Sequence, residues 1–181
     1  EGGEGAGKST QIQLLADSLR AHGHDVKLTR EPGGSEIANR IRSMILDPSM
    51  KGLISLAELF LYEASRAQHV ADTIFPSLEA GQVVICDRFT DSSIVYQGAA
   101  RGLDAKVVSG LNRIATGGLQ PKRTLLLDID PEAGLQRVGA RGNTLDRIEA
   151  EGLKFHKSVR AGYLRLARKE KKRIRLVRAS Q

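Results

Sequence analysis

Short apolar runs alternate along the chain with longer segments in which apolar residues recur at helical spacing. The strand-like runs fall at residues 25–29, 82–86, 124–128 and 173–177. The helical patterns begin after Ser9 and then cover residues 35–46, 55–73, 104–115, 131–141 and 148–168. An alternation of this kind predicts an α/β fold built on a parallel sheet.

Proline residues set the expected ends of several helices. Asp47-Pro48 should stop the helix of residues 35–46, because the residue before a proline disfavours helical backbone. Pro76 should kink or end the long helix that begins near Ser55. Pro131 suits the first turn of a helix, where its missing N–H costs nothing.

The chain has 181 residues, which fits one domain covering residues 1–181 with a sizeable core. Hydrophobic residues make up 40% and charged residues 27%, as is typical of globular proteins. One cysteine and no apolar run near 18 residues argue against a disulfide scaffold and a membrane span. No signal peptide is visible. We therefore expect a cytoplasmic protein with no membrane partner.

The net charge of +7 suits an anionic ligand such as a nucleotide. Much of the excess lies in residues 154–178, which raises the alternative of a nucleic-acid surface. Phe155 and Tyr163 are the aromatic residues of that stretch, so stacking on bases has little support. We expect a solvated helix face there and no nucleic-acid partner.

The segment Gly2-Gly3-Glu4-Gly5-Ala6-Gly7-Lys8-Ser9 matches the phosphate-binding pattern G-x-x-x-x-G-K-[ST] at every fixed position. Its glycines let the backbone bring N–H groups close to an anion, and the helix that follows points its positive end there. Lys8 would reach the β- and γ-phosphates, and the Ser9 hydroxyl would bind Mg²⁺. A glycine-rich helix cap without a ligand is the alternative. The pattern needs a preceding strand, which we expect to be missing from the sequence before Glu1.

Asp87 directly follows the apolar run Val83-Val84-Ile85-Cys86. An acid at the carboxyl end of a buried strand lies in the crevice where open α/β sheets bind ligands, and it can hold Mg²⁺ or its water. Asp87 could also simply end the strand. Arg88 is either the ion-pair partner of Asp87 or a clamp for the phosphate of an acceptor, and Cys86 is expected to be a small core residue.

Together with other segments of the chain, these residues resemble the bacterial thymidylate kinases over nearly the whole sequence. The resemblance is carried by GGEGAGKST, TREPGGS, the Asp87-Arg88-Phe89 step with Ser92 and Tyr96-Gln97-Gly98, LLLDIDPEAGLQR, RGNTLDRIE and VRAGYLRLA. It implies transfer of the γ-phosphoryl group of MgATP to dTMP, giving dTDP and ADP. It also implies a three-layer α/β/α P-loop NTPase fold with a central parallel sheet, a lid at about residues 141–149, and a homodimer.

The resemblance also implies roles for individual residues. The catalytic residues would be Lys8, Asp87, Arg88 and Arg147, and the metal ligands would be Ser9 and Asp87. ATP would be bound by Gly2, Gly3, Glu4, Gly5, Ala6, Gly7, Lys8, Ser9, Thr10 and Arg141. The acceptor dTMP would be bound by Glu4, Arg30, Tyr62, Arg66, Arg88, Ser92, Tyr96 and Gln97.

Tyr62 and Arg66 lie four residues apart on the expected long helix, hence on one face. The resemblance stacks Tyr62 on the thymine ring and directs Arg66 to its O4. A planar base with carbonyl groups needs such a stacking ring and a directed donor. The family more often has phenylalanine at position 62, and an arginine beside a core tyrosine is the purely structural alternative.

The remaining acceptor residues would contact the phosphate and the sugar. Arg30 and Arg88 would grip the phosphate with their guanidinium groups. Glu4 would bind the 3′-hydroxyl, and Tyr96 would crowd the 2′ position and exclude ribonucleotides. Ser92 and Gln97 would lie at or near the base. The Glu31-Pro32 peptide bond of this loop is a candidate for the cis form.

One position departs from part of the family. Some members carry an arginine in the phosphate loop where this chain has Gly5. The cation for the transition state must then come from elsewhere, and such a cation is worth about 10³–10⁵ in rate. Our hypothesis assigns this role to Arg147 and places Arg141 on or near adenine. Two solvated loop arginines are the alternative.

Three other functions compete with this interpretation. A kinase for another nucleotide, such as dCMP or UMP, is opposed by Tyr62, Arg66 and Tyr96-Gln97. A nucleotide switch or motor module fits poorly with Arg88 and with an acid in the phosphate loop. The only evidence for a basic nucleic-acid-binding ATPase is the run of positive charges in residues 154–178, and such runs specify function weakly.

Overall fold

A computed structural model describes residues 1–140, 142 and 144–179 of the chain. Its strands form two parallel pairs. Strand β1 (Val26–Arg30) pairs with β2 (Val83–Asp87), and β3 (Thr124–Asp128) pairs with β4 (Ile174–Arg178). Each strand lies within one residue of its predicted range, so the α/β fold with parallel strands is confirmed.

Residues 1–2 run along the other edge of β3. Gly2 forms a parallel bridge with Leu127, and the Leu127 N–H donates to the Glu1 carbonyl at 2.9 Å. The pair of β1 and β2 shares no ladder with these residues in the part of the chain that the structure describes. The expected central sheet is therefore seen as two parallel pairs.

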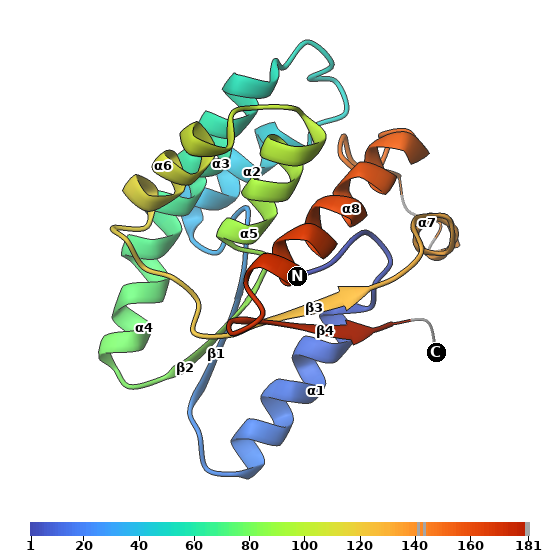
Figure 1. Cartoon of the computed structure of the whole chain (residues 1–181). Helices are drawn as coiled ribbons and strands as arrows, with labels where there is room; N and C mark the ends of the chain where they lie inside the picture. Colours follow the sequence, from blue (N-terminus) through green and yellow to red (C-terminus); the bar gives the residue numbers. More distant parts are fainter. Residues whose placement is uncertain (141, 143, 180–181) are drawn as a thin grey trace.

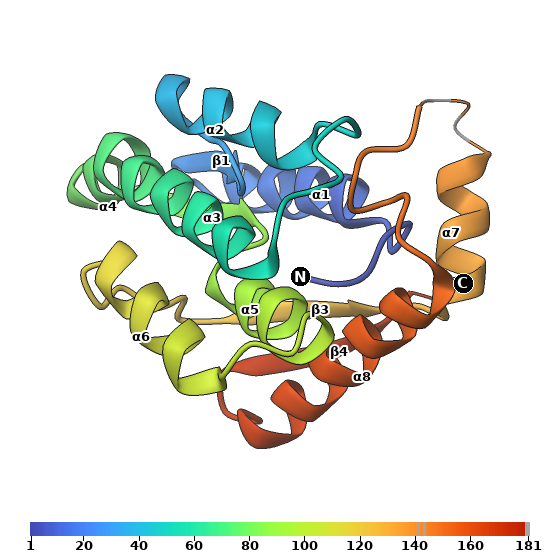
Figure 2. The same cartoon turned by 90° about the horizontal axis from the view of Figure 1, so that it is seen from above.

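Helices lie on both sides of the strands (Figure 1). Helix α1 (Lys8–Ala21) lies below β3 and β4 in this view, whereas α8 (Leu153–Lys169) lies above them. The other helical segments are α2 (Glu36–Leu46), α3 (Ser55–His69), η1 (Val70–Ile74), α4 (Phe75–Glu79), α5 (Thr90–Ser93), η2 (Ile94–Ala100), α6 (Ala105–Ala115) and α7 (Pro131–Gly139). Seen from above, α3 and α6 lie next to each other (Figure 2). No helix of the described residues combines the length and apolar character that a membrane crossing requires.

The largest buried apolar cluster fixes α8 on β3 and β4. Val159 and Tyr163 of α8 pack there against Leu126 of β3, Ile174 of β4 and Val95 of η2. These side chains are all less than 9% exposed. Burial of such side chains contributes roughly 1.5–3 kcal/mol each, so α8 and η2 are held firmly against β3 and β4.

Three helix predictions differ from the structure. Pro76 does not end the long helix, because a π-helical segment, η1, joins α3 to α4 and leaves Pro76 in the first turn of α4. Helix α8 begins at Leu153 rather than Ile148, since Gly152 precedes it and residues 147–150 form turns. Residues 90–100 are helical and were not expected to be.

The missed helical segment has a physical explanation. Its sequence contains the β-branched residues Ile94 and Val95 and a glycine, Gly98, which are weak helix formers. Val95 and Tyr96 are buried against α8, so tertiary packing outweighs this weak local preference. This segment carries three of the predicted site residues.

Candidate active site

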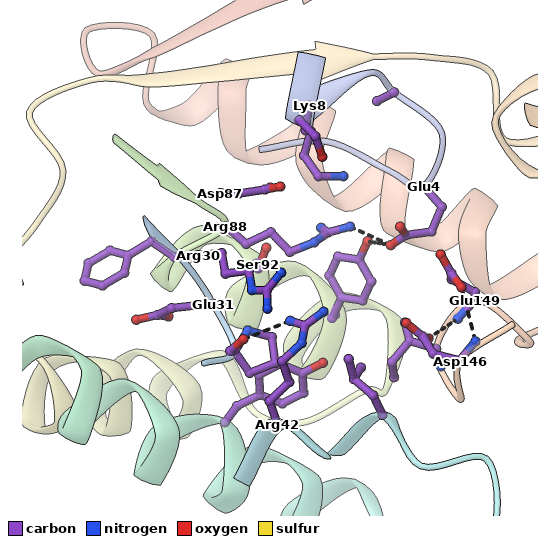
Figure 3. A pocket seen from close by; sticks show the side chains of 18 of the residues that line it. Glu4, Lys8, Arg30, Glu31, Arg42, Asp87, Arg88, Ser92, Asp146 and Glu149 are labelled. Atoms are coloured by element: carbon purple, nitrogen blue, oxygen red, sulfur yellow. Dashed lines mark hydrogen bonds and ion pairs between the residues drawn. The ribbon is translucent and has the colours of Figure 1, made fainter. Parts of the chain in front are cut away.

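A pocket of about 260 Å³ lies at the carboxyl ends of β1 and β2. Figure 3 shows the side chains that line it. Arg30 is the last residue of β1 and Asp87 the last of β2, and both line it. The lining residues are Glu4, Gly5, Ala6, Gly7, Lys8, Ser9, Thr10, Arg30, Glu31, Pro32, Arg42, Leu46, Tyr62, Arg66, Asp87, Arg88, Phe89, Ser92, Tyr96, Gln97, Asp146, Ile148 and Glu149. The structure thus brings together most of the residues singled out in the sequence.

The phosphate-loop segment has the backbone that an anion cradle needs. Gly7 has a left-handed φ of 83° and precedes α1, which starts at Lys8. Gly5 also has a positive φ, of 70°, and a Cβ at this position would overlap the backbone carbonyl of Gly134 in α7. An arginine at position 5 is therefore excluded by α7, which explains the departure from part of the family.

Lys8 lies folded back into this loop. Its Nζ donates to the carbonyl oxygens of Gly2 at 3.2 Å and Gly3 at 3.0 Å, and the residue is 9% exposed. Burial and the neighbouring cation of Arg88 lower the Lys8 pKa to about 8, although Glu4 and Asp87 act in the opposite direction. An anion bound in the loop would replace the two carbonyl contacts and stabilise the charged amine.

Asp87 and Ser9 offer oxygen atoms for a cation at the same end of the pocket. Oδ1 of Asp87 is buried and has no hydrogen-bond partner among the described residues. Ser9 lines the pocket from the first turn of α1. The described residues contain no group of three or more His, Cys, Asp or Glu side chains that could hold a metal. A carboxylate and a hydroxyl suit Mg²⁺, which usually takes its other ligands from phosphate and water.

Arg88 lies next to Asp87 and forms an ion pair with the phosphate loop. Its Nη2 is 2.5 Å from Oε1 of Glu4, and Tyr96 donates its hydroxyl to the same oxygen at 3.0 Å. Burial opposes ionisation of Glu4, but Arg88 and Lys8 outweigh it and lower the Glu4 pKa to about 2. Arg88 also has a left-handed φ of 68°, which is uncommon outside glycine.

Glu1 is a functional neighbour that the sequence did not reveal. Its carboxylate accepts from the Phe89 N–H at 2.7 Å, from the Ser92 hydroxyl at 2.6 Å and from the Tyr163 hydroxyl at 2.7 Å. These bonds hold the loop that carries Arg88. Nothing in the residue pattern signals this role, because the three partners come from distant parts of the chain.

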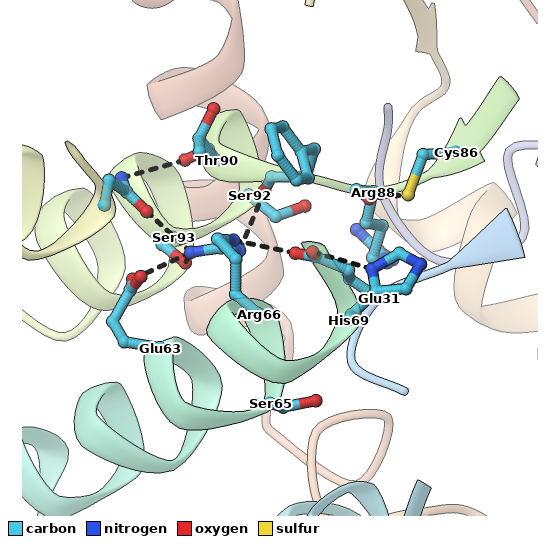
Figure 4. Close-up of polar contacts among 12 residues, drawn as sticks. Glu31, Glu63, Ser65, Arg66, His69, Cys86, Arg88, Thr90, Ser92 and Ser93 are labelled. Carbon is cyan, nitrogen blue, oxygen red and sulfur yellow. Dashed lines mark hydrogen bonds and ion pairs between the residues drawn. The ribbon is translucent and has the colours of Figure 1, made fainter. Parts of the chain in front are cut away.

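Arg66 lines the pocket but is almost completely buried, at 1% exposure. Figure 4 shows Glu31 and Glu63 beside it. Its Nε donates to Glu31 at 2.7 Å, and its Nη1 donates to Glu63 at 2.7 Å. These carboxylates outweigh the effect of burial and raise the Arg66 pKa. Among the described residues, only the Phe89 carbonyl accepts from Nη2, so one Nη2 hydrogen remains for a ligand. Most of the hydrogen-bonding capacity of this side chain is thus used within the protein.

The Glu31-Pro32 bond is cis, as the sequence suggested. The other oxygen of Glu31 contacts Nδ1 of His69 at 3.0 Å, and Nε2 of His69 lies 2.6 Å from the Thr29 hydroxyl (Figure 4 shows His69 and Glu31). Glu31 therefore links β1 to two buried side chains of α3.

Arg42 of α2 is a further cation of the pocket that the sequence analysis missed. Its Nη1 donates to the Pro32 carbonyl at 2.8 Å. Burial, and then the charge of Arg30, lower the Arg42 pKa, which indicates two like charges close together. A surplus of nearby cations without matched acids is what an anionic ligand would relieve. The signal available in the sequence was a lone arginine on α2, which is common on solvated faces.

The catalytic role of Arg147 stays a prediction, and its side chain is bound away from the phosphate loop in this structure. Its Nη1 is 2.7 Å from Oε2 of Glu58, and its Nε donates to the Ile45 carbonyl at 2.8 Å. Its neighbours Asp146 and Ile148 line the pocket, whereas Arg147 does not. The buried carboxylate of Glu58 holds the guanidinium in this position. Arg141, the other predicted lid arginine, lies outside the described residues.

The sequence comparisons agree on one family. A family model described as thymidylate kinase matches residues 1–181. Curated relatives include a thymidylate kinase from Desulfovibrio desulfuricans, 54% identical over 100% of this chain and 86% of the relative. Another, from Desulfosudis oleivorans, is 51% identical over 99% of this chain and 86% of the relative.

A solved structure is also similar. It is the crystal structure of the thymidylate kinase from Ehrlichia chaffeensis, with a TM-score of 0.79 and 34% sequence identity. The match covers 98% of this chain and 87% of that one. The likeness in fold therefore extends over nearly the whole of this chain.

We predict that Arg66 is essential for stability. In Arg66→Met, Glu31 and Glu63 lose their buried cation, and removing one partner of a buried pair costs roughly 3–5 kcal/mol. Urea unfolding followed by circular dichroism would measure this loss. The matched control is Arg40→Met, because Arg40 pairs with Glu36 on the surface of α2, where both side chains are at least 78% exposed. This change should cost less than about 1 kcal/mol. Equal stability of the two variants would contradict the prediction.

Proposed function

The chain belongs to the thymidylate kinase family, and from this membership we infer that it transfers the γ-phosphoryl group of ATP to dTMP, giving dTDP and ADP. The observation that carries this inference is the composition of the pocket. A phosphate loop with Lys8 lines one end, and the arginines Arg30, Arg42 and Arg88 face the same cavity. A kinase that joins two phosphorylated ligands needs such a pair of anion sites in one pocket.

We propose that residues Gly2–Thr10 cradle the phosphates of ATP. Backbone N–H groups and the start of α1 would contact the β-phosphate, and Lys8 would exchange its two carbonyl contacts for phosphate oxygens. Ser9 and Asp87 would hold Mg²⁺, a proposal supported by the unpartnered Oδ1 of Asp87. When bound, Mg²⁺ neutralises charge on the β- and γ-phosphates.

The acceptor phosphate is proposed to bind between Arg30, Arg42 and Arg88. Arg88 already lies beside the phosphate loop and would leave or share Glu4 when the phosphate arrives. Glu4 would then accept from the 3′-hydroxyl of the sugar. The Tyr96 hydroxyl donates to the same Glu4 carboxylate. This contact supports the proposal that Tyr96 lies beside the 2′ position of the sugar.

The base is proposed to lie at the far end of the pocket, between Tyr62 and Gln97 with Ser92 nearby. Tyr62 would stack on the ring, and the remaining Nη2 hydrogen of Arg66 would donate to O4. In this arrangement the protein performs little covalent chemistry. It aligns the two phosphates, spreads their charge and excludes water.

We propose that residues 141–149 form a lid over the pocket. Asp146 and Glu149 face the pocket within the proposed lid of residues 141–149, where the Asp146 carboxylate accepts from the N–H groups of Ile148 and Glu149 at 2.8 Å. Arg141 remains a proposed contact for adenine. The proposed three-layer arrangement is supported by the positions of α1 and α8 on opposite sides of the strands (Figure 1).

We further propose a cytoplasmic homodimer. The proposed cytoplasmic location is supported by the two nucleotide substrates. The dimer is supported by exposed apolar side chains on two neighbouring helices. Leu56 and Phe60 lie one turn apart on α3 and are 42% and 52% exposed, and Val107 and Ile114 on α6 are 47% and 78% exposed.

An acceptor panel tests the function. With ATP and Mg²⁺, we expect dTMP to give the highest kcat/KM in a coupled assay of ADP release. Loss of one buried methyl group, worth about 0.8 kcal/mol, should make dUMP roughly fourfold poorer. For dCMP the loss should exceed about tenfold, because cytosine lacks O4 and would leave a buried donor unpaired. No ADP release that depends on dTMP would overturn the function, and equal use of dCMP would overturn the role of Arg66.

Proton uptake tests the role of Lys8. Because its pKa is about 8 in the free protein, roughly half of the molecules carry a neutral amine at pH 8. Bound phosphate should restore the charge, so ATP binding should take up about half a proton at pH 8. Titration calorimetry in two buffers of different ionisation enthalpy measures this. Above pH 8 the affinity for ATP should fall, by up to tenfold per pH unit.

Lys8→Arg is the control for this measurement, since a guanidinium stays charged throughout the range. Its proton uptake on ATP binding at pH 8 should be smaller by about half a proton. Equal uptake by the two proteins would show that another group titrates.

A charge introduced on the exposed apolar face of α3 tests whether the protein forms the proposed dimer. Phe60→Asp should shift the protein to a monomer in light scattering, because a charge would be buried in the apolar contact. Leu14→Asp on α1 is the control, since Leu14 is equally exposed, at 58%, and lies away from α3 and α6. A wild-type protein that is monomeric at high concentration would contradict the proposal.

A further inference from the structure

Glu58 joins the base end of the pocket to two arginines. It is 1% exposed and lies on α3, one turn before Tyr62. Its Oε1 accepts from Nε2 of Gln97 at 2.9 Å and from Nε of Arg101 at 3.3 Å. Its Oε2 accepts from Nη2 of Arg101 at 3.2 Å and from Nη1 of Arg147 at 2.7 Å.

The two arginines hold this carboxylate in one orientation. Arg101 also pairs with Glu151 at 2.6 Å and stacks over the Phe155 ring at 4.6 Å. Arg147 is anchored separately by the Ile45 carbonyl. If Glu58 turned away from Gln97, Arg147 would lose its carboxylate partner and Arg101 would keep only Glu151, so the present orientation of Glu58 is favoured.

This fixed carboxylate determines which way the Gln97 amide faces. A carboxamide has an oxygen that accepts and a nitrogen that donates, whereas a carboxylate only accepts. The nitrogen of Gln97 must therefore face Glu58. Gln97 is 1% exposed and lines the pocket, so its oxygen is the polar end left for a ligand.

We propose that Glu58 is a positioning residue for acceptor specificity, which holds the Gln97 nitrogen and so presents the Gln97 oxygen to the base. This proposal rests on the proposed function. Thymine carries one ring N–H donor, at N3, which matches an acceptor. Cytosine has a lone pair at N3, which an oxygen repels. Glu58 thus selects for the protonated N3 without touching the substrate.

Glu58→Gln tests the proposal. Arg101 and Arg147 would attract the oxygen of the new carboxamide and turn its nitrogen toward Gln97. Gln97 would then turn its own oxygen to that nitrogen and its nitrogen to the base, where it pairs with N3 of cytosine. The ratio of kcat/KM for dTMP over dCMP should fall about tenfold, and kcat/KM for dCMP itself should rise. General loosening of the site would lower both values and leave the ratio unchanged.

Two further variants separate specificity from stability. Glu151→Gln removes the other acid that pairs with Arg101 but does not touch Gln97, so its ratio should stay at the wild-type value. Glu58→Gln/Arg147→Met removes one buried charge of each sign and keeps the cluster balanced if the single variant does not fold. Its ratio should fall as in Glu58→Gln.

Failure of the proposed kinase function and failure of the Glu58 role give different kinetic results. A wild-type protein without dTMP-dependent ADP release overturns the proposed function. A wild-type protein that prefers dTMP, with the same preference in Glu58→Gln or in the double variant, overturns the role of Glu58 alone. An equal fall of the ratio in Glu151→Gln also overturns it, because that residue does not orient Gln97.

Discussion

A buried cation requires an anion or several carbonyl oxygens within hydrogen-bond distance, and this requirement organises the pocket. Arg66 is held by Glu31 and Glu63, Arg88 by Glu4, and Lys8 by two backbone carbonyls. Removing one of these acids would leave a buried cation with fewer partners than its charge requires, at a cost of several kcal/mol. The positions of the helices that carry them are therefore tied to one another through charge as well as apolar packing.

The partners differ in how easily a ligand can replace them. Arg66 has two carboxylates and is 1% exposed, so it is a fixed part of the floor. Lys8 has only carbonyl partners and a pKa lowered to about 8, so phosphate improves its environment. Arg88 lies between these cases, because its single carboxylate partner belongs to the loop that receives the phosphates. The two groups that we propose exchange partners on ligand binding, Lys8 and Arg88, are thus those whose charge is less completely balanced by carboxylates.

The features that could be predicted from the sequence are those set by local residue patterns. The strand ranges, the glycine-rich loop before α1 and the acid at the end of β2 are all set by residues close together in the chain, and the structure places them as expected. The segment 90–100 was missed because its helix depends on packing against α8. Arg147 was proposed as the catalytic cation because Gly5 replaces an arginine of the phosphate loop, and nothing in the sequence indicated that a distant acid, Glu58, binds its side chain. Glu1 was missed for the same reason, since its partners come from remote segments, whereas Arg42 was missed because a lone arginine on a helix is common on solvated faces.

The contact between Gly5 and Gly134 restricts how this chain can change over evolutionary time. A Cβ on Gly5 overlaps the carbonyl of Gly134, and a Cβ on Gly134 overlaps the carbonyl of Glu4. At the present distance between the phosphate loop and α7, both positions therefore require glycine. A lineage that gained a side chain at position 5 would first need a displaced α7. The two positions form an epistatic pair, in which the order of substitutions decides whether intermediates fold.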